Sequence, residues 1–136
     1  MSEPVIHAGG CRCGDVRLTA EGAPLRTGVC YCEACRRATG AACAAYVDFP
    51  AEAVSFTGEP SVWSPEAGIE RLFCGRCGSP LAYRAAPLDP EGHAETAVHL
   101  GAFDAPEGFT PDHATHAGEA LGWIRRALAP LVEERR

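Results

Sequence analysis

Three cysteines within six residues, Cys30, Cys32 and Cys35, form the densest group of reactive side chains in this sequence. Thiolates bind zinc in a tetrahedron at about 2.3 Å, so this C-x-C-x2-C segment supplies three of the four ligands that zinc needs. The segment itself offers no fourth sulfur. Three protein ligands with one open position are typical of catalytic zinc, whereas structural zinc has four. The triplet therefore predicts an open zinc site.

Two cysteine pairs flank this triplet in the sequence. Cys11 and Cys13 form a C-x-C-G segment, and Cys74 and Cys77 form a C-x2-C-G segment. Neither pair can saturate a tetrahedral ion alone, but together they supply four thiolates. The glycine after each pair permits the positive φ that turns backbone amides toward a metal-bound sulfur. We therefore predict a closed, structural zinc site, which in zinc-finger peptides adds folding energy on the order of 10 kcal/mol.

Two arginines, Arg36 and Arg37, follow the triplet directly. A zinc ion held by three thiolates keeps a negative formal charge, so it needs nearby positive charge or hydrogen-bond donors. Arg36 or Arg37 could receive an anionic ligand above this zinc, and both could equally be solvated surface charges. Tyr31, inside the triplet, could hydrogen-bond a ligand or simply pack as an aromatic side chain.

The remaining candidates are histidines and one further cysteine. None of the five histidines has ligand spacing relative to a cysteine segment, so each is best interpreted as an ordinary surface or core residue. His99 and His116 are the candidates for a general base, because strand-end and loop positions can reach a site. Cys43 begins a run that alternates apolar residues, which favours a small buried hydrophobic residue. The alternative is that Cys43 closes the central site as a fourth ligand.

The composition limits the class of protein. A chain of 136 residues suffices for one core, so we expect a single zinc-binding domain over residues 1–136. The net charge of −6 argues against a nucleic-acid partner, which needs a basic surface. No apolar run approaches the roughly 20 residues of a membrane span, and the first ten residues are unlike a signal peptide. We therefore expect a cytoplasmic protein, where clustered cysteines are more often metal ligands or redox groups than disulfides.

Short alternating segments separated by glycines and prolines predict a mainly β fold with the cysteine segments at strand ends. One or two helical turns are expected over residues 33–38, ending near Gly40. A longer C-terminal helix is expected over residues 119–128, with Leu121, Ile124 and Leu128 on one stripe. Residues 87–92 are expected to form a polar loop and residues 105–116 an irregular segment. The predicted strands cover residues 4–7, 16–20, 25–31, 43–49, 54–56, 62–64, 69–73, 81–84 and 96–103.

Three motifs carry a family resemblance. They are G-C-R-C-G at residues 10–14, C-x-C-x2-C-R-R-x-T-G-A at residues 30–41, and F-C-G-x-C-G-S-P-L at residues 73–81. In these motifs, with seven cysteines of matching order and spacing, the chain resembles the glutathione-dependent formaldehyde-activating family. That family includes the centromere protein V group, and the resemblance covers about residues 5–103.

The resemblance implies several short coiled antiparallel sheets around the zinc sites, of the Mss4-like kind, with the C-terminal helix lying outside the matched part. It implies one structural zinc and a second zinc that is open toward a thiol. The founding activity of the family condenses glutathione and formaldehyde to S-hydroxymethylglutathione, a carbon–sulfur lyase reaction. The implied ligands are Cys11, Cys13, Cys74 and Cys77 for the structural ion, and Cys30, Cys32 and Cys35 for the open ion.

Three functions follow from these observations. The leading hypothesis is a zinc-dependent enzyme that joins a thiol such as glutathione to a small aldehyde, or releases the aldehyde from such an adduct. The sequence contains no lysine, which excludes lysine Schiff-base catalysis and leaves a metal or a thiol to act on a carbonyl. The alternative is a non-catalytic, zinc-stabilised module that binds a thiol ligand or a protein partner. A redox protein using Cys32 and Cys35 is less favoured, because Cys30 suits a metal better than a dithiol.

Overall fold

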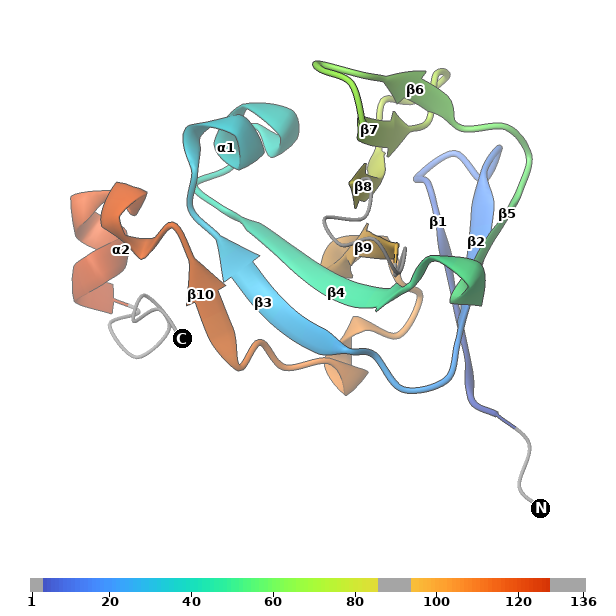
Figure 1. The fold of residues 1–136 in the computed structure, drawn as a ribbon, viewed down its shortest axis with the longest axis horizontal. Helices are drawn as coiled ribbons and strands as arrows, with labels where there is room; N and C mark the ends of the chain where they lie inside the picture. Colours follow the sequence, from blue (N-terminus) through green and yellow to red (C-terminus); the bar gives the residue numbers. More distant parts are fainter. Residues whose placement is uncertain (1–3, 86–93, 128–136) are drawn as a thin grey trace.

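The computed structural model describes residues 4–85 and 94–127, and the strands form two sheets (Figure 1). The smaller sheet is antiparallel and has the order β1-β2-β5. Buried Leu18 and Ala20 alternate with exposed residues along β2, as the sequence pattern predicts for a strand with one face in the core. The three strands are β1 (Ile6–Gly10), β2 (Arg17–Glu21) and β5 (Val54–Thr57).

The larger sheet contains seven strands in the order β10-β3-β4-β9-β8-β7-β6. Its neighbouring strands are antiparallel, except that β10 runs parallel to β3. The mainly β fold expected from the sequence is confirmed. The strands are β3 (Arg26–Cys30), β4 (Ala44–Pro50), β6 (Ser61–Trp63), β7 (Ile69–Phe73), β8 (Pro80–Ala85), β9 (Glu95–His99) and β10 (His113–Thr115).

Two short α-helices accompany the sheets. Helix α1 (Glu33–Thr39) ends where the sequence predicts, because Gly40 adopts a left-handed φ of 70° and donates its N–H to the Arg36 carbonyl. Helix α2 (Gly122–Ala127) is the described part of the expected C-terminal helix, and its Ile124 side chain is buried. Four single 3-10 turns complete the described helical structure: η1 (Ala51–Ala53), η2 (Leu100–Ala102), η3 (Pro106–Gly108) and η4 (Ala117–Glu119).

Several boundaries differ from the sequence predictions, and the first strand runs over Ile6–Gly10 rather than residues 4–7. The strand expected over residues 96–103 ends at His99 and continues as η2. The segment expected to be irregular over residues 105–116 contains β10, which pairs with β3 far away in the chain. The C-terminal α-helix begins later than expected, because the residues before it form η4. The loop expected over residues 87–92 lies outside the described residues.

The main core lies between the two sheets, where each fully buried large side chain contributes about 1.5–3 kcal/mol. It joins Leu18 of β2 to Val47 and Phe49 of β4 and to Val98 of β9. A second cluster packs Val29, Tyr31, Ala114, Ala120 and Ile124 together, which fastens α2 and β10 to β3. Figure 1 shows α2 and β10 at one end of the molecule and the smaller sheet at the other. None of the helices in the described ranges is long and apolar enough to cross a membrane.

Candidate metal centres and active site

The outer four cysteines meet at the junction of the two sheets. Cys11 and Cys13 lie in the connection from β1 to β2, and Cys74 and Cys77 lie in the connection from β7 to β8. All four sulfurs lie within 4.8 Å of one another. The Sγ atoms of Cys11 and Cys13 are 3.6 Å apart, and those of Cys13 and Cys74 are 3.7 Å apart. A tetrahedral zinc with ligands at 2.3 Å needs sulfurs about 3.8 Å apart, so the group fits this ion.

Backbone amides surround this outer cluster, as thiolate ligands require. The N–H groups of Arg76 and Cys77 both donate to the Sγ of Cys74 at 3.4 Å, and the N–H of Val16 donates to the Sγ of Cys11 at 3.3 Å. This last bond is the main reason that the pKa of the Cys11 thiol is lowered. The glycines that follow the pairs have the positive φ expected from the sequence, 87° at Gly14 and 81° at Gly78.

The inner three cysteines meet where β3 passes into α1. Cys30 ends the strand, Cys32 caps the helix, and Cys35 lies in the first helical turn. The N–H of Cys35 donates to the Sγ of Cys32 at 3.3 Å, which turns both side chains to the same side. The three sulfurs lie within 4.8 Å of one another, and those of Cys30 and Cys32 are 3.4 Å apart. Their number and spacing fit three corners of a zinc tetrahedron.

The inner cluster opens into a large pocket that the outer cluster does not line. Cys30, Cys32 and Cys35 all line a pocket of about 1090 Å³, and the four outer cysteines are absent from its lining. Residues of helix α1 and of strands β6, β7 and β8 are among those that line this pocket. Figure 1 shows these strands across from α1. The fourth position of an ion on the inner cluster is therefore reachable by a small molecule.

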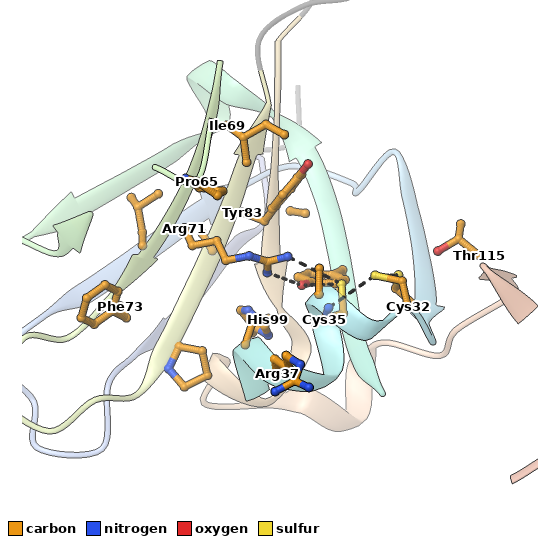
Figure 2. A pocket seen from close by; sticks show the side chains of 18 of the residues that line it. Cys32, Cys35, Arg37, Pro65, Ile69, Arg71, Phe73, Tyr83, His99 and Thr115 are labelled. Carbon is orange, nitrogen blue, oxygen red and sulfur yellow. Dashed lines mark hydrogen bonds between the residues drawn. The ribbon is translucent and has the colours of Figure 1, made fainter. Parts of the chain in front are cut away.

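An arginine and a tyrosine from the larger sheet contact the inner cluster. Figure 2 shows the arginine, Arg71, beside Cys35. The hydroxyl of Tyr46 on β4 is 3.4 Å from the Sγ of Cys35. Arg71 on β7 donates to the Tyr46 hydroxyl at 3.3 Å, and its second terminal nitrogen is 3.9 Å from the Cys35 Sγ. The Arg71 guanidinium lies over the ring of Tyr83, 5.0 Å from its centroid. The cluster thus has one cation and one hydroxyl beside it, both held by neighbouring strands.

These contacts direct negative charge to Cys35. Hydrogen bonds from Cys30, and further ones from Tyr46, Cys32 and Arg71, lower the pKa of the Cys35 thiol to about 5 despite its burial. The pKa of the Cys30 thiol is raised, because its hydrogen bond favours the protonated form and because it is buried. Burial is also the main reason that the pKa of the Tyr46 hydroxyl is raised, so this hydroxyl stays protonated at neutral pH and can donate a hydrogen bond.

Sequence reasoning did not find Arg71 and Tyr46. Both lie on strands in which the sequence pattern predicts only a half-buried sheet and no functional residue. The available signal in the sequence is a pair of charged residues, Glu70 and Arg71, inside a predicted strand. The structure shows that all residues of this strand are at least partly buried. A charge in such a position needs partners, which here are the Tyr46 hydroxyl and the Cys35 thiol.

Of the candidate residues in and next to the cysteine triplet, one lies at the pocket and two are used within the fold. Arg37 lines the pocket and is 80% exposed, with Glu33 as its i,i+4 partner. Arg36 instead donates to the carbonyls of Tyr31 and Glu119 at 2.8 and 3.1 Å, so it ties α1 to η4. The side chain of Tyr31 is fully buried in the cluster beneath α2 and is absent from the pocket lining.

The remaining candidates are placed as follows. Cys43 is partly buried and packs against the cluster beneath α2, which supports its interpretation as a packing residue. His99 and His116 both line the pocket, and so does His113. His99 is buried beside the Tyr46 ring, and burial lowers its pKa to about 4. His7 packs among phenylalanines away from the site, and His93 lies outside the described residues.

A family model described as glutathione-dependent formaldehyde-activating enzyme matches residues 6–119. The chain belongs to this family. The match extends past the motifs that carry the sequence resemblance and ends at the last residue of η4. It therefore includes both cysteine clusters, Tyr46 and Arg71, and the β10 strand that flanks Cys30. A search among curated proteins found no match to this member of the formaldehyde-activating family.

Proposed function

We propose that this protein is a zinc-dependent enzyme of the carbon–sulfur lyase type, which joins a thiol such as glutathione to a small aldehyde. One observation carries the proposal: all three cysteines of the inner cluster line a pocket large enough for a small molecule, whereas the outer cluster already supplies the four sulfurs of a complete zinc tetrahedron. Family membership supports the same thiol and aldehyde chemistry. We assign the open zinc to Cys30, Cys32 and Cys35, and the structural zinc to Cys11, Cys13, Cys74 and Cys77.

Zinc at the inner cluster would lower the pKa of a thiol that reaches it, so that a nucleophilic thiolate is present near neutral pH. The thiolate sulfur then forms a bond to the carbonyl carbon, and the π electron pair of the C=O bond moves to oxygen. A proton reaches this oxygen and yields the S-hydroxyalkyl adduct. We assign the stabilisation of the negative oxygen to the Arg71 guanidinium and a hydrogen bond to it to the Tyr46 hydroxyl, because both groups contact Cys35.

The proton of the incoming thiol needs an acceptor at the pocket. His99 is a weak base, because burial lowers its pKa to about 4. His116 lines the same pocket, has a side chain that is 58% exposed, and places its Nδ1 3.3 Å from Glu119. We therefore assign the general-base role to His116 rather than to His99. Arg37 is the cation in position to meet the carboxylates of an anionic thiol, whereas Arg36 is used within the fold.

The experiment measures exchange between glutathione, formaldehyde and S-hydroxymethylglutathione by NMR, with and without the zinc-loaded protein. The proposal expects exchange to exceed the uncatalysed rate, and expects Cys35→Ser to abolish the excess while the protein stays folded. A rate equal to the uncatalysed one, for several thiols and aldehydes, would leave only a zinc-stabilised binding module. Cys43→Ser serves as the matched control, since Cys43 lies outside both clusters.

The domain organisation and the location of the protein are also proposals. We propose a single zinc-binding domain over residues 1–136 of the Mss4-like kind, acting on small molecules in the cytoplasm. The outer cluster supports the first point, because it links the connections of the two sheets into one unit. Limited proteolysis of the zinc-loaded protein tests it, since a single unit resists cleavage between the two sheets.

A further inference from the structure

The pocket above the inner cluster is far larger than formaldehyde requires. Its volume is about 1090 Å³, and pockets of roughly 300–1,000 Å³ hold drug-sized ligands. Formaldehyde has two non-hydrogen atoms, and the reaction places it within bonding distance of the thiol sulfur. The hydroxymethyl group that formaldehyde forms on the thiol sulfur therefore contacts only a small part of the pocket wall.

That wall is apolar on the side formed by β6, β7 and β8. Trp63 ends β6, Pro65 follows it, Ile69 begins β7, and Tyr83 lies on β8; all four line the pocket. Trp63 is 58% exposed, although tryptophan is a residue that usually loses most of its exposure on folding. An exposed aromatic residue at the edge of a pocket offers a large rigid surface to a ligand.

Charge divides the pocket into two sides. Figure 2 shows Pro65, Ile69 and Tyr83 on one side of Arg71 and Arg37 on the other. The apolar side carries Glu66, whose carboxylate repels anions. The carboxylates of a glutathione-like thiol are therefore directed toward Arg37 on α1, and the apolar wall is left to the other reactant.

We propose, on the basis of the function proposed above, that the preferred aldehyde carries an aromatic or branched apolar group that packs against Trp63, Pro65 and Ile69. The thiol sulfur and the carbonyl carbon meet at the inner cluster, and the substituent on that carbon extends toward β6. Trp63 is then a specificity-determining residue, since it contacts the substituent and not the reacting atoms.

The test uses two stable thioethers that share one thiol and differ only in the group on sulfur, S-methylglutathione and S-benzylglutathione. Isothermal titration calorimetry with the full-length, zinc-loaded protein gives both dissociation constants. We expect the benzyl thioether to bind at least about tenfold more tightly, because its ring removes apolar surface from water. Trp63→Ala is expected to reduce this preference at least about threefold.

Trp123→Ala is the matched control, because Trp123 is 55% exposed, lies on α2 and is absent from the pocket lining. It is expected to leave the preference unchanged. Equal affinity for the two thioethers, or an undiminished preference in Trp63→Ala, would overturn the inference. Because these are binding measurements, they are read separately from the exchange rates: a protein that accelerates formaldehyde exchange yet binds both thioethers equally refutes this inference and keeps the proposed function.

Discussion

The terminal nitrogen Nη2 of Arg71 lies 3.9 Å from the Sγ of Cys35, across 36 residues of chain. The same guanidinium donates to Tyr46 and lies over the Tyr83 ring, so its position is held from two directions. A strand of the larger sheet thereby brings positive charge to a cluster of thiolates on the opposite side of the pocket.

Replacing Arg71 by methionine is expected to weaken zinc binding at the inner cluster. The change removes a charge-assisted contact of about 2 kcal/mol, which corresponds to roughly a 30-fold loss of affinity. Competition with a colorimetric chelator measures it, since the inner zinc should be released before the outer one. Arg84→Met is the control, because Arg84 is an arginine on the adjacent strand β8 whose guanidinium lies over Phe56. Equal chelator profiles for Arg71→Met and the wild type would show that Arg71 does not support the cluster.

Serine substitutions should separate the two clusters. Cys74→Ser removes a proposed zinc ligand that is only 1% exposed and lies in the cluster between the two sheets, so we expect a loss of several kcal/mol in unfolding free energy. Cys35→Ser should leave the protein folded, with one zinc per chain instead of two. Elemental analysis and urea unfolding give both quantities. A Cys35→Ser protein that unfolds like Cys74→Ser would mean that both clusters are structural.

Arg36 and Arg37 are neighbours with different expected effects. Arg36→Ala should lower the unfolding free energy by about 2 kcal/mol, because it removes two hydrogen bonds to the carbonyls of Tyr31 and Glu119. Arg37→Ala removes only an exposed ion pair with Glu33 and should change stability by less than about 0.5 kcal/mol. It should, however, weaken glutathione binding about fivefold, measured by calorimetry. The reverse pattern would contradict the assignment of roles.

His99 should make stability depend on pH. Burial lowers its folded-state pKa to about 4 from the usual 6.5, so the unfolded chain binds more protons between these values. The stability contribution is present above pH 6.5 and is lost as pH falls toward 4, by about 2 kcal/mol between pH 7 and pH 5. Urea unfolding of His99→Leu at pH 7 and at pH 5 should show a decrease in unfolding free energy that is smaller than the wild-type decrease by this amount.

The control for this measurement is His116→Asn. His116 is exposed and has a left-handed φ of 53°, which asparagine tolerates. The substitution removes an imidazole from an exposed position, and the unfolding of this variant at both pH values is compared with that of His99→Leu. If His99→Leu also shows the wild-type loss, then His99 does not titrate in this range.

Local chemistry made much of this protein predictable. The spacing of Cys30, Cys32 and Cys35 specifies three sulfurs on one short turn, because a strand end followed by a helical turn brings them to one side. Turn residues and alternation likewise predict most strands and the end of α1 at Gly40, since each depends on a few adjacent residues. The union of the two outer pairs also follows from the sequence, because zinc requires four ligands and each pair supplies two.

Other features were decided only by the tertiary structure. Whether the inner cluster is open depends on what lies above it, and that is set by how the sheet places β6, β7 and β8 opposite α1. The same pairing delivers Arg71 to Cys35, and the docking of η4 occupies Arg36 while Arg37 remains free to face the pocket. A local sequence pattern cannot distinguish Arg36 from Arg37. Their roles diverge because contacts between distant segments determine which charge is used within the fold and which meets a ligand.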